Sequence, residues 1–244
     1  ETGEAELLVL PLAGGATVDV DGETFELEGR RGVFSGVTDY LYVGRGKTLT
    51  ITSALGGRFA FPSALAARDI PVAYYPKSQV RVDLRGAGDC SRQVNNYSLA
   101  VEGVTTSHLL ACEVITPGGN WSSYPPHKHD EHNEVERILE EIYYYEVRPG
   151  LNGSPGMALQ RIYPSGHDID VCAEVHSRDV VTMPHGYHGP SVAAPGYDLY
   201  YLNVMAGPAE DSTWLMTDDP AYTWIRDTWA SQDVDPRLPM TPLN

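Results

Sequence analysis

Short runs of apolar residues recur along the whole chain, and turn-forming residues separate them. Val, Leu, Ile, Tyr and Thr dominate these runs, whereas Gly, Pro and Asp-Gly pairs fall between them, a pattern typical of strands joined by tight turns. In the first half, the expected strands cover residues 6–11, 16–20, 24–27, 40–43 and 48–52. In the second half, they cover residues 107–115, 141–147, 157–163, 180–183 and 197–205. Many strands with closely spaced turns predict an all-β fold of the sandwich or barrel type.

Two features mark the turns and ends of this pattern. Asp21-Gly22 follows the run 16–20 and precedes the run 24–27, which predicts a β-hairpin. Helical signals are scarce, and the clearest begins near Asp219, because Pro220 at the first helical position suits an Asp N-cap. Ile225 and Trp229 are four residues apart and would pack this short helix, beside Trp224, onto the rest of the fold.

The distribution of glycine and charge suggests two halves. The Gly-rich stretch 85–89 is expected to connect an N-terminal half, residues 1–90, with a C-terminal half, residues 91–244. Residues 130–140 form a strongly acidic insertion, for which we expect one helical turn on a loop. The two halves do not repeat recognisably in sequence, so a duplication is an expectation about the fold only.

Composition and charge narrow the class of partner. The net charge of −16 argues against nucleic acid, which needs a basic face, and against an anionic membrane surface. No apolar run approaches the length that spans a bilayer, so we expect a soluble protein. The three cysteines are odd in number and lack CxxC spacing, which argues against a disulfide framework and fits a cytoplasmic location. A small anionic substrate would need a local cation in such an acidic protein.

Candidate chemistry concentrates in the second half, where seven of the eight histidines lie at or beyond His127. His127 and His129 are two residues apart, and in a strand they project from the same face while Lys128 points away. Two imidazoles on one face are half of a typical metal site, which a carboxylate and a third imidazole would complete. The alternative is a pair of surface histidines in a loop after Pro125 and Pro126.

Strand periodicity selects the carboxylate. If Glu141 faces inward, its companions are Tyr143, Tyr145 and Val147, whereas an inward Glu140 would bring Glu146 with it, a second buried charge. We therefore predict that Glu141 is the ligand.

The third imidazole could come from His176, His185 or His188. Residues 179–183 indicate a strand, residues 184–186 a turn, and His188 the start of the returning strand. His185 lies within the turn and is expected to be exposed, so His188 is favoured. His132 and His167 lie in polar loops, where we expect them to be solvated.

These residues resemble a known family. The His-x-His pair, the Glu at the head of a strand and the later Pro-x-Gly-x-His match the paired motifs of the cupin superfamily. More narrowly, the string Asn-Trp-Ser-Ser-Tyr-Pro-Pro-His-Lys-His at residues 120–129 resembles the 5-deoxy-glucuronate isomerase family of myo-inositol catabolism. Similar matches lie at residues 140–145, 159–163 and 195–208. The resemblance covers nearly the whole chain.

The resemblance implies a bicupin, meaning two tandem cupin-like β-barrels of the jelly-roll type with few short helices. The N-terminal half, which contains no histidine, would be a cupin-like half without metal. The C-terminal half would be the metal-binding one. Full-length relatives are expected to begin before Glu1, which would leave an opening strand or two outside the chain.

The implied activity is an intramolecular oxidoreduction, the aldose-ketose isomerisation of 5-deoxy-glucuronate to 5-dehydro-2-deoxy-gluconate. One divalent metal ion on His127, His129, Glu141 and His188 would stabilise the enediolate that forms when a proton leaves the carbon beside the carbonyl. Zinc, manganese, iron and nickel all suit such ligands. Three imidazoles and one carboxylate would leave coordination positions open for the sugar.

The remaining roles follow from chemistry and strand geometry. Glu141 and Tyr143 are the candidate catalytic groups, and a metal hydroxide stays an alternative base. Tyr145, Arg161 and Asn203 are the candidate substrate-binding residues, of which Arg161 is the expected partner of the substrate carboxylate if it faces the pocket. Alternating tyrosines on a strand are also common in cores, and alternation alone does not say which face of 157–163 is inside.

Two other functions are compatible with the same pattern. A cupin dioxygenase would hold iron on the same ligands and consume oxygen. A non-catalytic sugar-binding cupin would use the barrel as a cavity only. A homo-oligomer also stays open, since barrels with apolar outer faces often pair.

Overall fold

Strands are the predominant regular secondary structure in this computed structural model, which describes residues 1–99, 103–211 and 213–240. The predicted all-β class is confirmed. Helical structure among the described residues is limited to short segments, namely α1 (Ile225–Thr228), η1 (Lys77–Gln79), η2 (Gly88–Cys90) and η3 (Trp229–Ser231). No helix among these residues has the length and apolar character needed to cross a bilayer.

The N-terminal sheet is built around one long strand of 16 residues, β1, which pairs with five other strands. Where the pattern predicted two strands, 6–11 and 16–20, the structure has one. Gly14 adopts φ +83° at a register shift and lets β1 bend without ending. The sheet contains β1 (Ala5–Val20), β2 (Glu23–Arg30), β3 (Tyr40–Val43), β4 (Leu49–Thr52), β5 (Arg58–Ala60), β6 (Ser63–Leu65) and β7 (Ala73–Tyr75).

The predicted hairpin at Asp21-Gly22 is present. Val20 pairs with Glu23, so the loop has two residues, and both have positive φ, 51° for Asp21 and 90° for Gly22. This conformation matches the right-handed twist of the two flanking strands.

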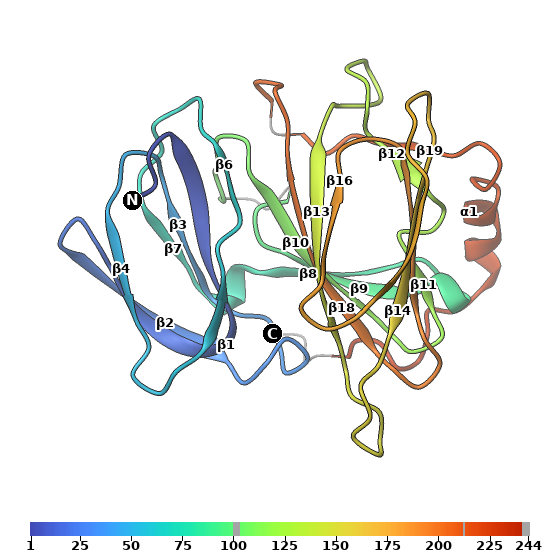
Figure 1. The fold of residues 1–244 in the computed structure, drawn as a ribbon, viewed down its shortest axis with the longest axis horizontal. Helices are drawn as coiled ribbons and strands as arrows, with labels where there is room; N and C mark the ends of the chain where they lie inside the picture. The colour runs from blue at the N-terminus through green and yellow to red at the C-terminus, as the bar shows by residue number, and fades with distance from the viewer. Residues whose placement is uncertain (100–102, 212, 241–244) are drawn as a thin grey trace.

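Two facing sheets form the C-terminal half, on the right in Figure 1. The first, in the order β16-β13-β18-β10-β9-β8, contains β8 (Arg81–Arg85), β9 (Arg92–Asn96), β10 (Leu110–Thr116), β13 (Glu140–Val147), β16 (Val180–Met183) and β18 (Leu199–Ala206). The second contains β11 (Trp121–Ser122), β12 (His127–Lys128), β14 (Ala158–Tyr163), β15 (Val171–Val175), β17 (Tyr187–Ala193) and β19 (Thr217–Asp218). Buried side chains from both sheets, such as Tyr143, Tyr201 and Ile162, form one core between them.

The Gly-rich stretch 85–89 is a hairpin turn and not a linker. It joins β8 to β9, whose end residues Arg85 and Arg92 pair across the turn. Gly86 has φ +74°, and a Cβ there would lie 2.2 Å from the Cys90 carbonyl oxygen, so the tight turn requires glycine. Strand pairing therefore groups residues 81–90 with the C-terminal sheet. A division of the chain into domains stays a prediction, and this pairing favours a boundary between β7 and β8.

The two halves share a buried interface. Leu8, Tyr40 and Tyr42 of the N-terminal sheet pack in one cluster with Ile115 and Tyr200 of the C-terminal half. At its centre, the Glu113 carboxylate is fully buried and accepts hydrogen bonds from Arg30, Asn95, Tyr97 and Tyr200. Charged and apolar contacts thus hold the halves together.

Two local expectations require correction. The described structure of the acidic insertion is a loop without a helical turn, because Glu136 accepts hydrogen bonds from the backbone N–H groups of Asp130 and Glu131 and folds the segment back on itself. The C-terminal helix lies where the pattern placed it but is short. Asp219 begins a series of turns, its carboxylate accepting from the Ala221 N–H, and the α-helix itself starts only at Ile225.

Candidate metal centre

Three histidines from two neighbouring strands lie side by side in the C-terminal half. His127 in β12 pairs directly with His188 in β17, and His129 follows two residues after His127. The ring centroids of His127 and His188 are 4.5 Å apart, and those of His129 and His188 are 4.6 Å apart. One ring nitrogen from each histidine falls within 4.8 Å of the others, and all three side chains are buried. The structure brings together the three imidazoles that the sequence singled out.

Glu141 of β13 reaches the same point from the opposite sheet. Its Oε2 atom lies 3.1 Å from Nε2 of His129 and 2.8 Å from Nε2 of His188. The alternation along β13 is as predicted, because Glu141 is 2% exposed whereas Glu140 faces solvent. The carboxylate therefore lies beside two of the three imidazoles.

The outer ring nitrogens of two histidines face backbone carbonyls. Nδ1 of His129 lies 2.7 Å from the Leu139 carbonyl oxygen, and Nδ1 of His188 lies 3.1 Å from that of Gly186. A carbonyl oxygen only accepts, so each of these rings carries its proton on Nδ1 when it is neutral, which leaves Nε2 available as a metal ligand. Orientation of a ligand histidine by a carbonyl is common at metal sites.

Two buried polar atoms at this point lack a hydrogen-bond partner, Oε1 of Glu141 and Nε2 of His188. The 2.8 Å approach between His188 and Glu141 is short enough for an ion pair but lacks hydrogen-bond geometry. Unpartnered buried atoms of this kind are costly, and a cation among them would remove that cost. The donor set of three imidazoles and one carboxylate fits a divalent transition metal ion.

Burial and charge set the protonation of these groups. Burial, together with the neighbouring His188, holds the pKa of His127 well below its usual range, so this ring is neutral. Burial alone would raise the pKa of Glu141, but the adjacent His188 and His129 outweigh it and lower that pKa. An ionised carboxylate and a neutral imidazole are the forms that coordinate metals.

The other candidate histidines lie elsewhere. His176 is exposed, and its ring contacts Glu174 and the Gly156 carbonyl. His185 is half-buried and not exposed as expected, because its ring packs 5.0 Å from that of His167.

The segments that carry the histidines are anchored by two acidic residues. Both carboxylate oxygens of Asp130 lie 3.1 Å from the backbone N of Gly186, in the turn that precedes His188, and Asp130 also accepts from Ser165. Lys128 does point away from the imidazoles, into a buried ion pair with Glu136 at 2.8 Å. The acidic insertion thus supports the site.

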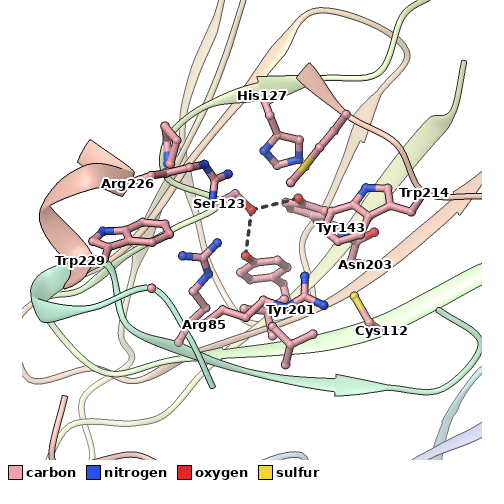
Figure 2. Close-up of a pocket in the computed structure, with 16 residues that line it drawn as sticks. Arg85, Cys112, Ser123, His127, Tyr143, Tyr201, Asn203, Trp214, Arg226 and Trp229 are labelled. Atoms are coloured by element: carbon pink, nitrogen blue, oxygen red, sulfur yellow. Dashed lines mark hydrogen bonds between the residues drawn. The ribbon is translucent and has the colours of Figure 1, made fainter. Parts of the chain in front are cut away.

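A cavity of about 240 Å³ extends from His127 between the two sheets (Figure 2). Hydroxyl groups line part of it. The Ser123 hydroxyl lies 3.2 Å from that of Tyr143 and 3.0 Å from that of Tyr201, which in turn donates to Ser122. The aromatic rings of Tyr143 and Tyr201 stack at 4.5 Å. The cavity is therefore polar on this wall and small enough for a small molecule only.

The predicted catalytic and substrate-binding residues divide into two groups. Tyr143 and Asn203 line the cavity, and Oδ1 of Asn203 has no hydrogen-bond partner there. Tyr145 is buried beside the cavity, and its hydroxyl donates to Gln160 at 2.7 Å.

Arg161 does not reach the cavity. Gln160 and Ile162 are the buried residues of β14, so Arg161 lies on the outer face of the sheet, where it bonds Asp170 and the Val171 carbonyl. Its expected contact with a substrate carboxylate is not compatible with this position. Alternation could not identify the inner face of β14 because both faces carry apolar residues.

Sequence reasoning missed the cations that do line the cavity, Arg85, Arg92 and Arg226. Arg85 begins the stretch 85–89 that was interpreted as a linker, Arg92 lies just after that stretch, and no strand was assigned to either residue. If residues 81–85 and 92–96 had been interpreted as a hairpin around Gly86, the two arginines would have been placed in one sheet. Trp214, which lies 6.3 Å from His127 between ring centroids, was also missed because it sits in an irregular segment.

The chain is similar to known proteins over most of its length. The chain is 38% identical over 231 residues to the 5-deoxy-glucuronate isomerase of Geobacillus thermodenitrificans, covering 93% of this chain and 81% of that protein. It is 37% identical over 228 residues to the protein of the same name from Bacillus subtilis, covering 92% and 81%.

Solved structures extend the likeness to the fold. A crystal structure of an IolB-like protein from Salmonella typhimurium superimposes with a TM-score of 0.84 at 34% identity, covering 92% of this chain and 83% of that one. An oxalate decarboxylase of Bacillus subtilis gives a TM-score of 0.55 at 12% identity, over 89% of this chain and 66% of that one. The latter concerns the fold alone and agrees with the predicted bicupin. The model described as the KduI/IolB family matches residues 1–225, and the chain belongs to that family.

Proposed function

We propose that this protein is an aldose-ketose isomerase that converts 5-deoxy-glucuronate to 5-dehydro-2-deoxy-gluconate. The observation that carries the proposal is the 38% identity, over 93% of the chain, to a protein named 5-deoxy-glucuronate isomerase. The site supports it, since a buried group of possible metal ligands adjoins a small cavity with one polar wall. The likeness to oxalate decarboxylase, at 12% identity, does not favour a decarboxylase or an oxygenase.

His127, His129, His188 and Glu141 would hold one divalent metal ion, for which zinc, manganese, iron and nickel all suit the donors. The two unpartnered atoms, Oε1 of Glu141 and Nε2 of His188, support this assignment. When bound, such an ion supplies a positive charge that polarises the substrate carbonyl and stabilises negative charge on its oxygen.

The reaction moves a carbonyl by one carbon. A proton leaves the hydroxyl-bearing carbon beside the aldehyde, the former aldehyde carbon gains a proton, and the hydroxyl and carbonyl oxygens exchange roles. Glu141 is the carboxylate nearest to the imidazoles and is ionised, which makes it a candidate base.

Tyr143 is suited to donate or relay a proton and not to abstract one. Burial, together with the Glu141 carboxylate, raises its pKa well above the usual value, so its hydroxyl is protonated at neutral pH. Ser123 connects it to Tyr201, whose pKa burial raises to about 12. Asn203 offers a free carbonyl oxygen that can accept from a sugar hydroxyl. The position of Tyr145, bonded to Gln160, favours support of this wall over contact with substrate.

The remaining parts of the proposal concern partners and location. The partner is a small sugar acid, with no nucleic acid and no membrane, and a homo-oligomer stays open. The three cysteines of the described chain are free, in line with a cytoplasmic enzyme.

The test is turnover of 5-deoxy-glucuronate in deuterated water, followed by proton NMR under air and under nitrogen. We expect the aldehyde-derived signals to give way to those of a ketose, with deuterium entering the new hydroxymethyl group if a proton is transferred. Equal rates in both atmospheres are expected. Oxygen consumption that tracks turnover would replace the isomerase with a dioxygenase, and binding without conversion would leave a sugar-binding protein.

A further inference from the structure

Three arginines line the wall of the cavity that reaches His127. Arg85 ends β8, Arg92 begins β9 and Arg226 lies in α1. Figure 2 shows Arg226 and Trp229 on one side of the cavity, with Tyr143 and Trp214 on the other. In a protein of net charge −16, this is a local concentration of positive charge.

Arg85 and Arg92 lie directly opposite each other across the β8–β9 hairpin. Like charges in this cross-strand position repel, and they destabilise a sheet unless an anion lies between or beside them. The repulsion between these two arginines disfavours the folded sheet, so stability of the fold does not explain why both are present.

Only part of this charge is neutralised by the described residues. Arg226 forms a two-pronged ion pair with Asp218, one contact being 2.8 Å. Arg85 has a single distant contact with Asp83, at 3.4 Å. Arg92 donates to the backbone carbonyls of Cys90 and Tyr124, at 3.0 and 3.4 Å, and meets no carboxylate among the described residues.

Aromatic rings fix the positions of the guanidinium groups. Arg85 lies 5.2 Å from the centre of the Trp214 ring, and Arg92 lies 5.9 Å from that of Trp229. Cation–π attraction at these distances helps to hold each guanidinium group in place beside the cavity. Burial, and the positive charges of Arg85 and Arg226, lower the pKa of Arg92. Arg92 is thus a partly buried cation that no carboxylate of the described residues balances.

We propose that Arg92, assisted by Arg85, forms the subsite that binds the carboxylate of a sugar-acid substrate, while the carbonyl end of the substrate lies at the histidine end of the cavity. This inference rests on the proposed function and deepens it. The aldehyde and the carboxylate of 5-deoxy-glucuronate are at opposite ends of its carbon chain, so one cavity must recognise both. Arginine matches a carboxylate with two parallel N–H donors.

The subsite makes the enzyme specific for acids. In the wild type, 5-deoxy-glucuronate should be turned over with a much higher kcat/KM than 5-deoxy-glucose, in which a primary alcohol replaces the carboxylate. Arg92→Gln should lower kcat/KM for the acid by about a hundredfold, the scale of a lost charge-assisted contact, and leave the value for the alcohol nearly unchanged. Arg92→Lys should recover part of the loss because it keeps the charge.

The matched control is Arg161→Gln, an arginine of the same half that lies on the outer face of β14. It should leave the preference for the acid unchanged. Circular dichroism and metal content establish that each variant is folded and that its histidine site is intact. If Arg92→Gln fails to fold, Arg85→Gln, whose side chain is 29% exposed, serves as the second variant and should show the same loss of preference.

The outcomes separate the subsite from the function. If the wild type isomerises the acid but folded Arg92→Gln keeps the full preference for it, the subsite is wrong and the isomerase stands. If the wild type isomerises neither compound, the proposed function fails. Calorimetric binding of D-glucuronate then tests whether Arg92 forms the carboxylate subsite. Weaker binding by Arg92→Gln alone would support the subsite, and equal binding by all variants would overturn it.

Discussion

The Nε2 atom of His188 lies 2.8 Å from the Oε2 atom of Glu141, yet this Nε2 atom has no hydrogen-bond partner. The other ring nitrogen of His188, Nδ1, faces the Gly186 carbonyl oxygen, and the pKa of Glu141 is lowered, so its carboxylate is ionised. A neutral His188 ring that donates to this carbonyl through Nδ1 directs its Nε2 lone pair at the carboxylate, which is an unfavourable contact in a buried site. A metal ion that accepts both would make the same arrangement favourable, which is the strongest structural reason for placing one here.

Asp130 is expected to affect the metal affinity of this site without being a ligand. Its carboxylate holds the Gly186 N–H in the turn before His188. In Asp130→Ala the turn loses this support, so we expect metal affinity to fall about 10-fold or more. Competition with a chromophoric chelator measures the change. Asp168→Ala, at an exposed position of a nearby loop, is the control, and equal affinity in the two variants would contradict the supporting role of Asp130.

The buried Lys128–Glu136 pair is expected to stabilise the acidic insertion. Lys128→Met would leave the Glu136 carboxylate, 2% exposed, without its cation, so we expect the free energy of unfolding to fall by about 3 kcal/mol. Urea denaturation measures this loss. Lys77→Met breaks an ion pair whose partner, Glu28, is 73% exposed, and it should cost less than about 1 kcal/mol. Equal losses in both variants would show that the insertion does not depend on Lys128.

Asp235 should make the C-terminal segment sensitive to acid. Hydrogen bonds from Arg237 and Asn120 lower its pKa to about 2, below the ~3.9 of an unfolded chain. A carboxyl with a lowered folded pKa contributes stability above its unfolded pKa and loses it as the pH falls toward its folded pKa. Asp235→Asn should therefore lower the melting temperature more at pH 6 than at pH 3. A pH-independent difference would contradict this assignment.

Strand alternation was sufficient to predict much of the site. His127 and His129 share a face because they are two residues apart, and Glu141 faces inward as predicted. The argument against burying a second acid does not hold, because Glu146 is buried on the other face of β13, where it pairs with Arg58. The order of strand, turn and returning strand identified His188. These features are local, so they can be inferred from a single sequence.

The parts that could not be predicted depend on which segments meet in space. Arg92 reaches the cavity because residues 81–96 form a hairpin at the edge of the C-terminal sheet, and Trp214 reaches it from an irregular segment. Arg161 has the chemistry of a carboxylate ligand but faces outward. Alternation could not reveal this orientation, because both faces of its strand carry apolar residues. The continuous course of β1 was missed because Gly14 bends the strand without ending it.

The most direct test is the metal content of the purified protein, measured by elemental analysis for wild type, His129→Ala and His176→Ala, together with turnover of 5-deoxy-glucuronate by each. We expect about one divalent ion per chain in the wild type and in His176→Ala, whose ring is exposed and outside the group. His129→Ala should lose the metal and the isomerisation together. Folded wild-type protein that takes up no divalent ion, or His129→Ala that keeps both metal and activity, would contradict a metal centre at these residues.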